Sequence, residues 1–103
     1  MLDNLTLETF APLVGQTFRL QLEGHGAVDA VLQSVNAVPV TGWQPPGGAP
    51  VRQPFSLLFL GPPDFVLPQQ IYRFEQADLG TLELFIVPVG RTAEGVSYEA
   101  VFS

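Results

Sequence analysis

Residues 17–23 read TFRLQLE, a strict alternation of apolar and polar side chains. Successive side chains of a β-strand point to opposite faces, so this alternation predicts a strand with one dry face and one wet face. Further strands are predicted over 27–38, 54–60, 70–76, 81–89 and 96–102. Short turns and no helices separate these stretches. The sequence therefore predicts an all-β fold, an antiparallel small barrel or sandwich of about six strands.

Two of the predicted strands contain an irregularity. The alternation in 27–38 changes phase near Gln33 and Ser34, which indicates a β-bulge. Pro88 lies near the end of 81–89, and because proline donates no ladder hydrogen bond, we expect it at an edge or a bulge.

One short helix precedes the strands. Leu5–Leu13 carries apolar residues at helical spacing, so a helix is expected near residues 6–13. Thr6 suits its N-cap and Gly15 its C-terminal cap. Residues 1–103 are expected to form a single domain around one core.

The charge balance excludes several classes of function. Four arginines and no lysine stand against ten acidic residues, giving a net charge of −6. No basic stripe is available for nucleic acid or for an anionic membrane. Charged residues make up 14% of the chain, so either neutral polar side chains coat the surface or part of it is apolar and contacts a partner. Neither a signal peptide nor a membrane-spanning stretch is recognisable, so we expect synthesis in the cytoplasm.

Carboxylates are the first candidates for chemistry. Four of them would meet if their strands are neighbours: Glu75, Asp78, Glu83 and Glu99. Paired carboxylates hydrolyse glycosides or bind calcium, but these match no calcium loop and alternate as solvated faces do. Arg73 would pair with one of them across strands.

The other chemical candidates are isolated. The chain has no Cys and one His, His25, in a Gly-His-Gly turn; alone it makes a poor metal site, and an exposed turn residue is the simpler interpretation. Ser56 and Ser97 are nucleophiles by type only, without the turn that presents a catalytic serine. We therefore expect no catalytic residue, no metal, no cofactor and no enzymatic activity.

The Pro/Gly-rich loop over residues 40–52 carries the only tryptophan. The candidate binding residues in it are Trp43, Gln44, Pro45 and Pro46. An exposed tryptophan suits a protein anchor or carbohydrate stacking; alternatively, Trp43 folds back over one end of the barrel. Edge strands are the other candidate surface, because an unpaired edge accepts a strand from another chain; Pro54 and Pro88 would guard such edges.

Several segments together resemble a family of small bacterial proteins of unassigned function. They are residues 2–10, 55–59, 67–69, 82–90 and 98–102. Members of that family tend to be encoded near phage-tail-collar-like fibre proteins. The resemblance implies a structural or accessory role in a tail-like or surface assembly, and it supplies no active-site residues.

The function expected from these observations is a non-enzymatic structural or adaptor subunit that contacts a protein partner or further copies of itself. A small-molecule ligand is not expected in this function. The alternative is a carbohydrate-binding module that uses Trp43 together with Tyr72 or Tyr98.

Replacing the tryptophan separates these functions. In a structural subunit, Trp43→Ala weakens assembly or partner capture and leaves the monomer folded, whereas in a carbohydrate-binding module it abolishes glycan binding. Sedimentation and glycan-array binding of the variant distinguish the two. An unfolded variant would contradict both roles for Trp43.

Overall fold

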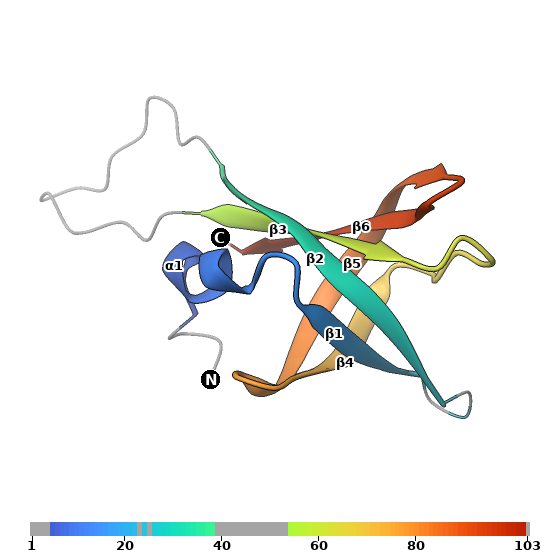
Figure 1. Ribbon diagram of the computed structural model, residues 1–103, viewed down its shortest axis with the longest axis horizontal. Coiled ribbons are helices and arrows are strands. Elements are labelled where there is room, and N and C mark those ends of the chain that lie inside the picture. Colours follow the sequence, from blue (N-terminus) through green and yellow to red (C-terminus); the bar gives the residue numbers. More distant parts are fainter. Residues whose placement is uncertain (1–4, 23, 25, 39–53, 103) are drawn as a thin grey trace, which may run out of the picture.

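The computed structural model describes residues 5–22, 24, 26–38 and 54–102. Within these ranges a short helical segment precedes six strands (Figure 1). The elements are α1 Leu7–Phe10, the 3-10 helix η2 Ala11–Leu13, β1 Thr17–Leu22, β2 Gly26–Ala37, β3 Phe55–Gly61, β4 Gln70–Gln76, β5 Gly80–Thr92 and β6 Gly95–Phe102. The predicted all-β fold is confirmed, and it is a closed barrel rather than a sandwich.

The barrel is made of two three-stranded meanders. Its strand order is β1-β2-β3-β6-β5-β4, and all neighbouring strands are antiparallel. The two meanders meet along β3 and β6, whose ladder runs from Phe55–Phe102 to Gly61–Val96. They meet again along β1 and β4, where the ladder contains only Arg19–Glu75, Leu20–Phe74 and Gln21–Arg73. Closure is therefore broad on one side of the barrel and narrow on the other.

Both expected irregularities are present. The β2–β3 register shifts between Leu32 and Ser34, which confirms the bulge predicted near Gln33. The β5–β6 register shifts between Pro88 and Gly90, so the proline lies at a bulge. At a bulge Pro88 does not need the backbone N–H that it lacks. The strand β5 therefore continues to Thr92, three residues past the end that the alternation predicted.

The N-terminal helix is shorter than the expected span of 6–13. It has one α-helical turn, after which the chain tightens into η2 around Pro12, a residue without a backbone N–H. Thr6 is the N-cap, as expected, and its backbone N–H donates to the Thr9 hydroxyl at 3.0 Å. Gly15 follows with a φ of 92°, as a C-terminal cap requires. In the part of the chain that the structure describes, no helix has the length and apolar character needed to cross a membrane.

Three phenylalanines fill the middle of the barrel. Phe18 of β1, Phe59 of β3 and Phe74 of β4 are all fully or almost fully buried. The Phe18 and Phe59 ring centroids lie 5.1 Å apart, edge to face, and those of Phe59 and Phe74 lie 5.2 Å apart. Since the rings come from both meanders, their contacts hold the two halves together.

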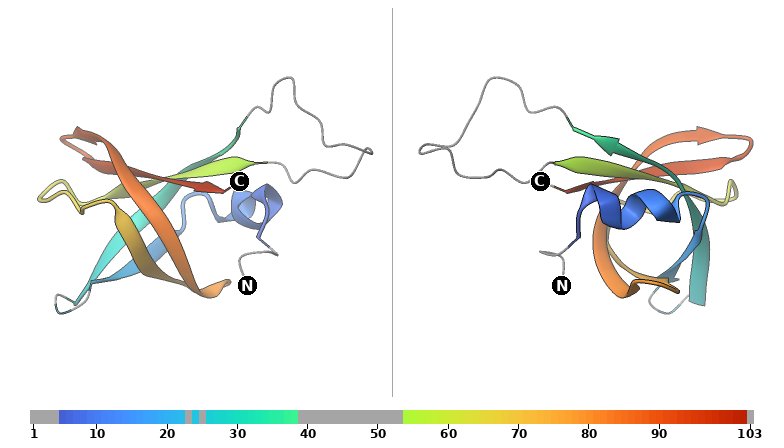
Figure 2. Two further views of the ribbon diagram at one scale, coloured as in Figure 1. Left: turned by 180° about the vertical axis from the view of Figure 1, so that it is seen from behind. Right: turned by 60° about the vertical axis from the view of Figure 1, so that its left-hand side comes forward.

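A second group of rings closes one end of the barrel, where α1 and η2 lie across the opening (Figure 2). The Phe10 ring centroid is 5.8 Å from that of Phe55 and 5.5 Å from that of Phe102. Phe55 and Phe102 stack on each other at 4.6 Å. Phe10 is completely buried, so the helical segment is a plug for the core.

We expect Phe10→Ala to lower the free energy of unfolding by about 3 to 5 kcal/mol, because it leaves a cavity between α1 and the Phe55–Phe102 pair. Urea denaturation measures the loss. Val14→Ala is the matched control: Val14 is 46% exposed just past η2, so its change costs about 0.5 kcal/mol or less. Equal losses of unfolding free energy for the two variants would contradict the role of Phe10 in closing this end of the core.

Candidate functional site

The loop candidates and the histidine lie outside the described residues. This applies to Trp43, Gln44, Pro45 and Pro46, and to His25. The candidates that the structure describes are the carboxylates, the two serines, the tyrosines and the strand edges.

The carboxylates do not converge on one site. Glu83 lies directly across from Arg73 on the β4–β5 ladder, but the ion pair of the described residues joins Arg19 and Asp29, so the expected pairing of Arg73 with a carboxylate extends only to their register. Glu75 pairs in register with Thr81, and Glu99 lies on β6 between Leu58 and Val87. No three metal-ligating side chains gather among the described residues.

The two serines lack a base beside them. Ser56 of β3, 8% exposed, has Asn36 and Val101 as its cross-strand neighbours. Ser97 of β6 has Leu60 and Gly90. Neither position places an acid or a histidine next to the hydroxyl, so the ladders of the described strands form no nucleophile–base pair.

The expectation of a free edge strand is wrong. Each described strand has a neighbour on both sides, because the sheet closes on itself. Strand addition along a whole edge is therefore impossible in this fold. The exception is local: β1 and β4 pair over only three residues and separate at both ends of that short ladder. An open groove lies at each of these ends.

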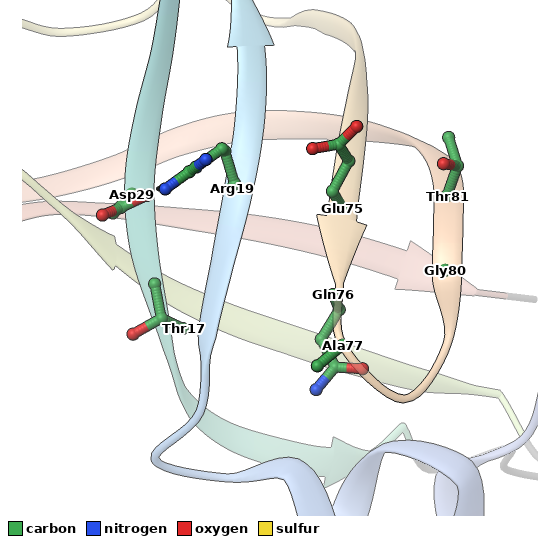
Figure 3. A pocket seen from close by; sticks show the side chains of 8 residues that line it. All are labelled: Thr17, Arg19, Asp29, Glu75, Gln76, Ala77, Gly80 and Thr81. Atoms are coloured by element: carbon green, nitrogen blue, oxygen red, sulfur yellow. Dashed lines mark hydrogen bonds and ion pairs between the residues drawn. The ribbon is translucent and has the colours of Figure 1, made fainter.

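The first groove, the Arg19 groove, has a volume of about 500 Å³ (Figure 3). Its lining residues are Thr17, Arg19, Asp29, Glu75, Gln76, Ala77, Gly80 and Thr81. The Arg19 side chain points toward Asp29, with 3.4 Å between Nε and Oδ1. Both side chains are about three-fifths exposed (59% and 61%), so the pair contributes about 0 to 1 kcal/mol.

The polar groups of the Arg19 groove serve the fold. Glu75 accepts a hydrogen bond from the Gln21 amide at 2.9 Å. The Gln76 side-chain oxygen accepts the backbone N–H groups of Asp78 and Leu79 at 2.7 and 2.8 Å, which closes the β4–β5 turn. Few of its polar side chains are left without such a structural contact.

The second groove, the Leu22 groove, is larger, at about 690 Å³. Its lining residues are Gln21, Leu22, Leu67, Pro68, Gln70, Ile71, Tyr72, Arg73 and Glu83. Apolar side chains, neutral hydrogen-bonding groups and one charge of each sign are mixed in it. Its volume lies in the range of ligand sites in proteins, whereas its lining is more polar than that of most such sites.

Two tyrosine hydroxyls hold Leu67 and Pro68, which form one wall of the Leu22 groove. The Tyr98 hydroxyl accepts the backbone N–H of Leu67 at 2.9 Å, and the Tyr72 hydroxyl donates to the backbone oxygen of Pro68 at 2.7 Å. Tyr72 is 5% exposed and Tyr98 is 2% exposed, counted over the whole residue. The interpretation that either tyrosine stacks on a carbohydrate is therefore wrong, because neither ring face is accessible.

Sequence reasoning missed one surface feature beside this groove. Ile71 and Phe85 are direct cross-strand neighbours on β4 and β5, and they are 63% and 52% exposed. We call these two residues the Ile71–Phe85 pair. The sequence already indicated this feature. The alternation places Ile71 on the same solvent face as Arg73 and Glu75, and it places Phe85 on the same solvent face as Glu83.

Comparison with known proteins identifies one family. A family model described as Domain of unknown function (DUF6916) matches residues 5–102. No curated protein and no solved structure matches the chain.

The buried tyrosine predicts a loss of stability in alkali. Burial raises the pKa of the Tyr72 phenol above its ordinary value of 10.0, and the neighbouring Tyr98 phenol raises it further. The folded state then holds this proton more tightly than the unfolded state does. The resulting stabilisation is complete below the unfolded pKa and is lost as the pH rises through the folded pKa.

We expect Tyr72→Phe to lower the free energy of unfolding by about 0.5 to 1.5 kcal/mol near pH 8, through loss of the hydrogen bond to Pro68. The difference between the variant and the wild type shrinks as the pH rises above about 10, because only the wild type carries this phenol. Urea denaturation of both proteins over this range measures it. A difference in the free energy of unfolding that stays constant with pH would contradict the raised pKa of the Tyr72 phenol.

Proposed function

The chain belongs to the DUF6916 family, a domain of unknown function, and we propose that it is a non-enzymatic structural or adaptor subunit that binds protein, either a partner or further copies of itself. The context we propose is a phage-tail-like or surface assembly of a bacterium, reached after synthesis in the cytoplasm. The resemblance of the chain to proteins encoded near tail-collar-like fibre proteins supports this context.

The observation that carries the proposal is the Ile71–Phe85 pair. The outer face of a barrel strand ordinarily carries polar residues, as Arg73 and Glu83 do in the next row of the same ladder. Two large apolar side chains that are more than half exposed gain about 1 kcal/mol each when a partner covers them. Val87, on the same face of β5 and half-buried, extends this apolar surface.

Sedimentation velocity over a wide concentration range tests self-association. If copies of the chain bind one another, the wild type forms defined oligomers that shift toward monomer when Ile71→Gln and Phe85→Gln are combined, because both changes remove apolar area from the contact. Val31→Gln is the matched control. Val31 is 37% exposed on β2, the strand opposite β5 in the barrel order, and its replacement leaves the oligomers unchanged.

A wild-type protein that stays monomeric shifts the test to a partner protein. A photoreactive phenylalanine analogue at position 85 is then expected to give a discrete cross-linked product in the producing cell, and the same analogue at position 31 none. A monomer that gives no product specific to position 85 would contradict the proposed function.

A further inference from the structure

The short β1–β4 ladder leaves part of β4 with a strand on one side only. The ladder ends at Gln21–Arg73, whereas the β4–β5 ladder continues to Gln70–Ile86. Gln70–Tyr72 therefore has β5 on one side and, among the described residues, no strand on the other. On that open side lies the Leu22 groove, which the same three residues help to line.

We infer that the Leu22 groove receives an extended segment of a partner protein, which adds as a short strand beside Gln70–Tyr72. The backbone of β4 supplies the pairing, and one apolar side chain of the segment fills the groove against Leu22, Leu67 and Ile71. This inference rests on the proposed function and names its site and its partner. Although the barrel has no free edge strand, a partner strand can therefore still pair over these three residues of β4.

The net negative charge of the protein favours a positively charged partner segment. The protein carries a net charge of −6, and within the groove Arg73 is balanced by Glu83. A segment with Lys or Arg beside its apolar residue is attracted by the surrounding field. A second copy of the chain brings another −6 and is repelled, so the occupant is a cationic partner rather than a copy.

The Arg19 groove at the other end of the ladder does not fit such a segment. Its larger side chains are polar, and Arg19, Glu75 and Gln76 already have partners within the fold. It provides no apolar wall for an anchoring side chain. It therefore supplies a position for a matched control.

A display library of random peptides of about eight residues, selected on the wild-type protein, tests the inference. We expect enriched peptides with an apolar residue flanked by Lys or Arg. Their binding weakens several-fold between about 0.05 and 0.3 M salt, because the attraction is screened. Amide chemical-shift changes in the protein are expected to concentrate at Gln70–Tyr72.

Two substitutions localise the binding. Gln70→Trp fills the groove and weakens binding of the most enriched peptide by about tenfold or more, as steric exclusion of a buried anchor requires. Thr81→Trp makes the same change in the Arg19 groove and leaves the affinity unchanged. Methylating the central backbone nitrogen of the peptide also weakens binding by about tenfold, because strand pairing needs that N–H.

The inference is overturned if no peptide is enriched, if enriched peptides are acidic, or if backbone methylation leaves the affinity unchanged. The methylation test uses the wild-type protein, so it decides even if Gln70→Trp fails to fold. Cross-linking from position 85 is independent of Gln70. A cross-linked partner without any peptide binder refutes this inference alone, while a peptide binder without a cross-linked partner or oligomer refutes the adaptor function.

Discussion

Contact among Phe18, Phe59 and Phe74 is the interaction on which the barrel depends. The three rings join strands of both meanders at the centre of the interior. Burying three such side chains contributes about 5 to 9 kcal/mol, whereas a ladder of three residue pairs contributes about 2 to 4 kcal/mol net. On the β1–β4 side the barrel is therefore closed by its core more than by its backbone hydrogen bonds. A short ladder is tolerable there because the rings behind it maintain closure.

Closure changes which surfaces the chain can offer to another molecule. In an open sheet the edge backbones are the sites of association, and the sequence pattern alone favours them. In the closed barrel the backbone groups of the strand edges are paired. On the described strands another molecule can therefore be bound only by outward side chains and at the ends of the short β1–β4 ladder. The Ile71–Phe85 pair and the Leu22 groove are these two kinds of surface, and Ile71 belongs to both.

Local features of the fold were predictable from the sequence, and long-range features were not. Alternation placed all six strands, and the phase change at Gln33 and the proline at 88 located both bulges, because each depends on neighbouring residues only. The pairing of β3 with β6 and the shortness of the β1–β4 ladder depend on how the interior packs, which no local pattern encodes. For the same reason the Leu22 groove, assembled from β1, β4, β5 and the segment before β4, had no signature in the sequence.

The groove and the core are linked through the tyrosines. Leu67 and Pro68, which form part of the groove wall, are held by hydroxyl groups whose rings lie inside the barrel. Gly61 leaves room for this arrangement, since a Cβ there would come within 3.0 Å of the Tyr98 ring. A wall fixed by one buried and one part-buried hydrogen bond is already ordered before a ligand arrives, so binding loses less conformational entropy at this wall than at a mobile loop. The side chains that stabilise this end of the barrel thus also preorganise the surface at which we place the partner.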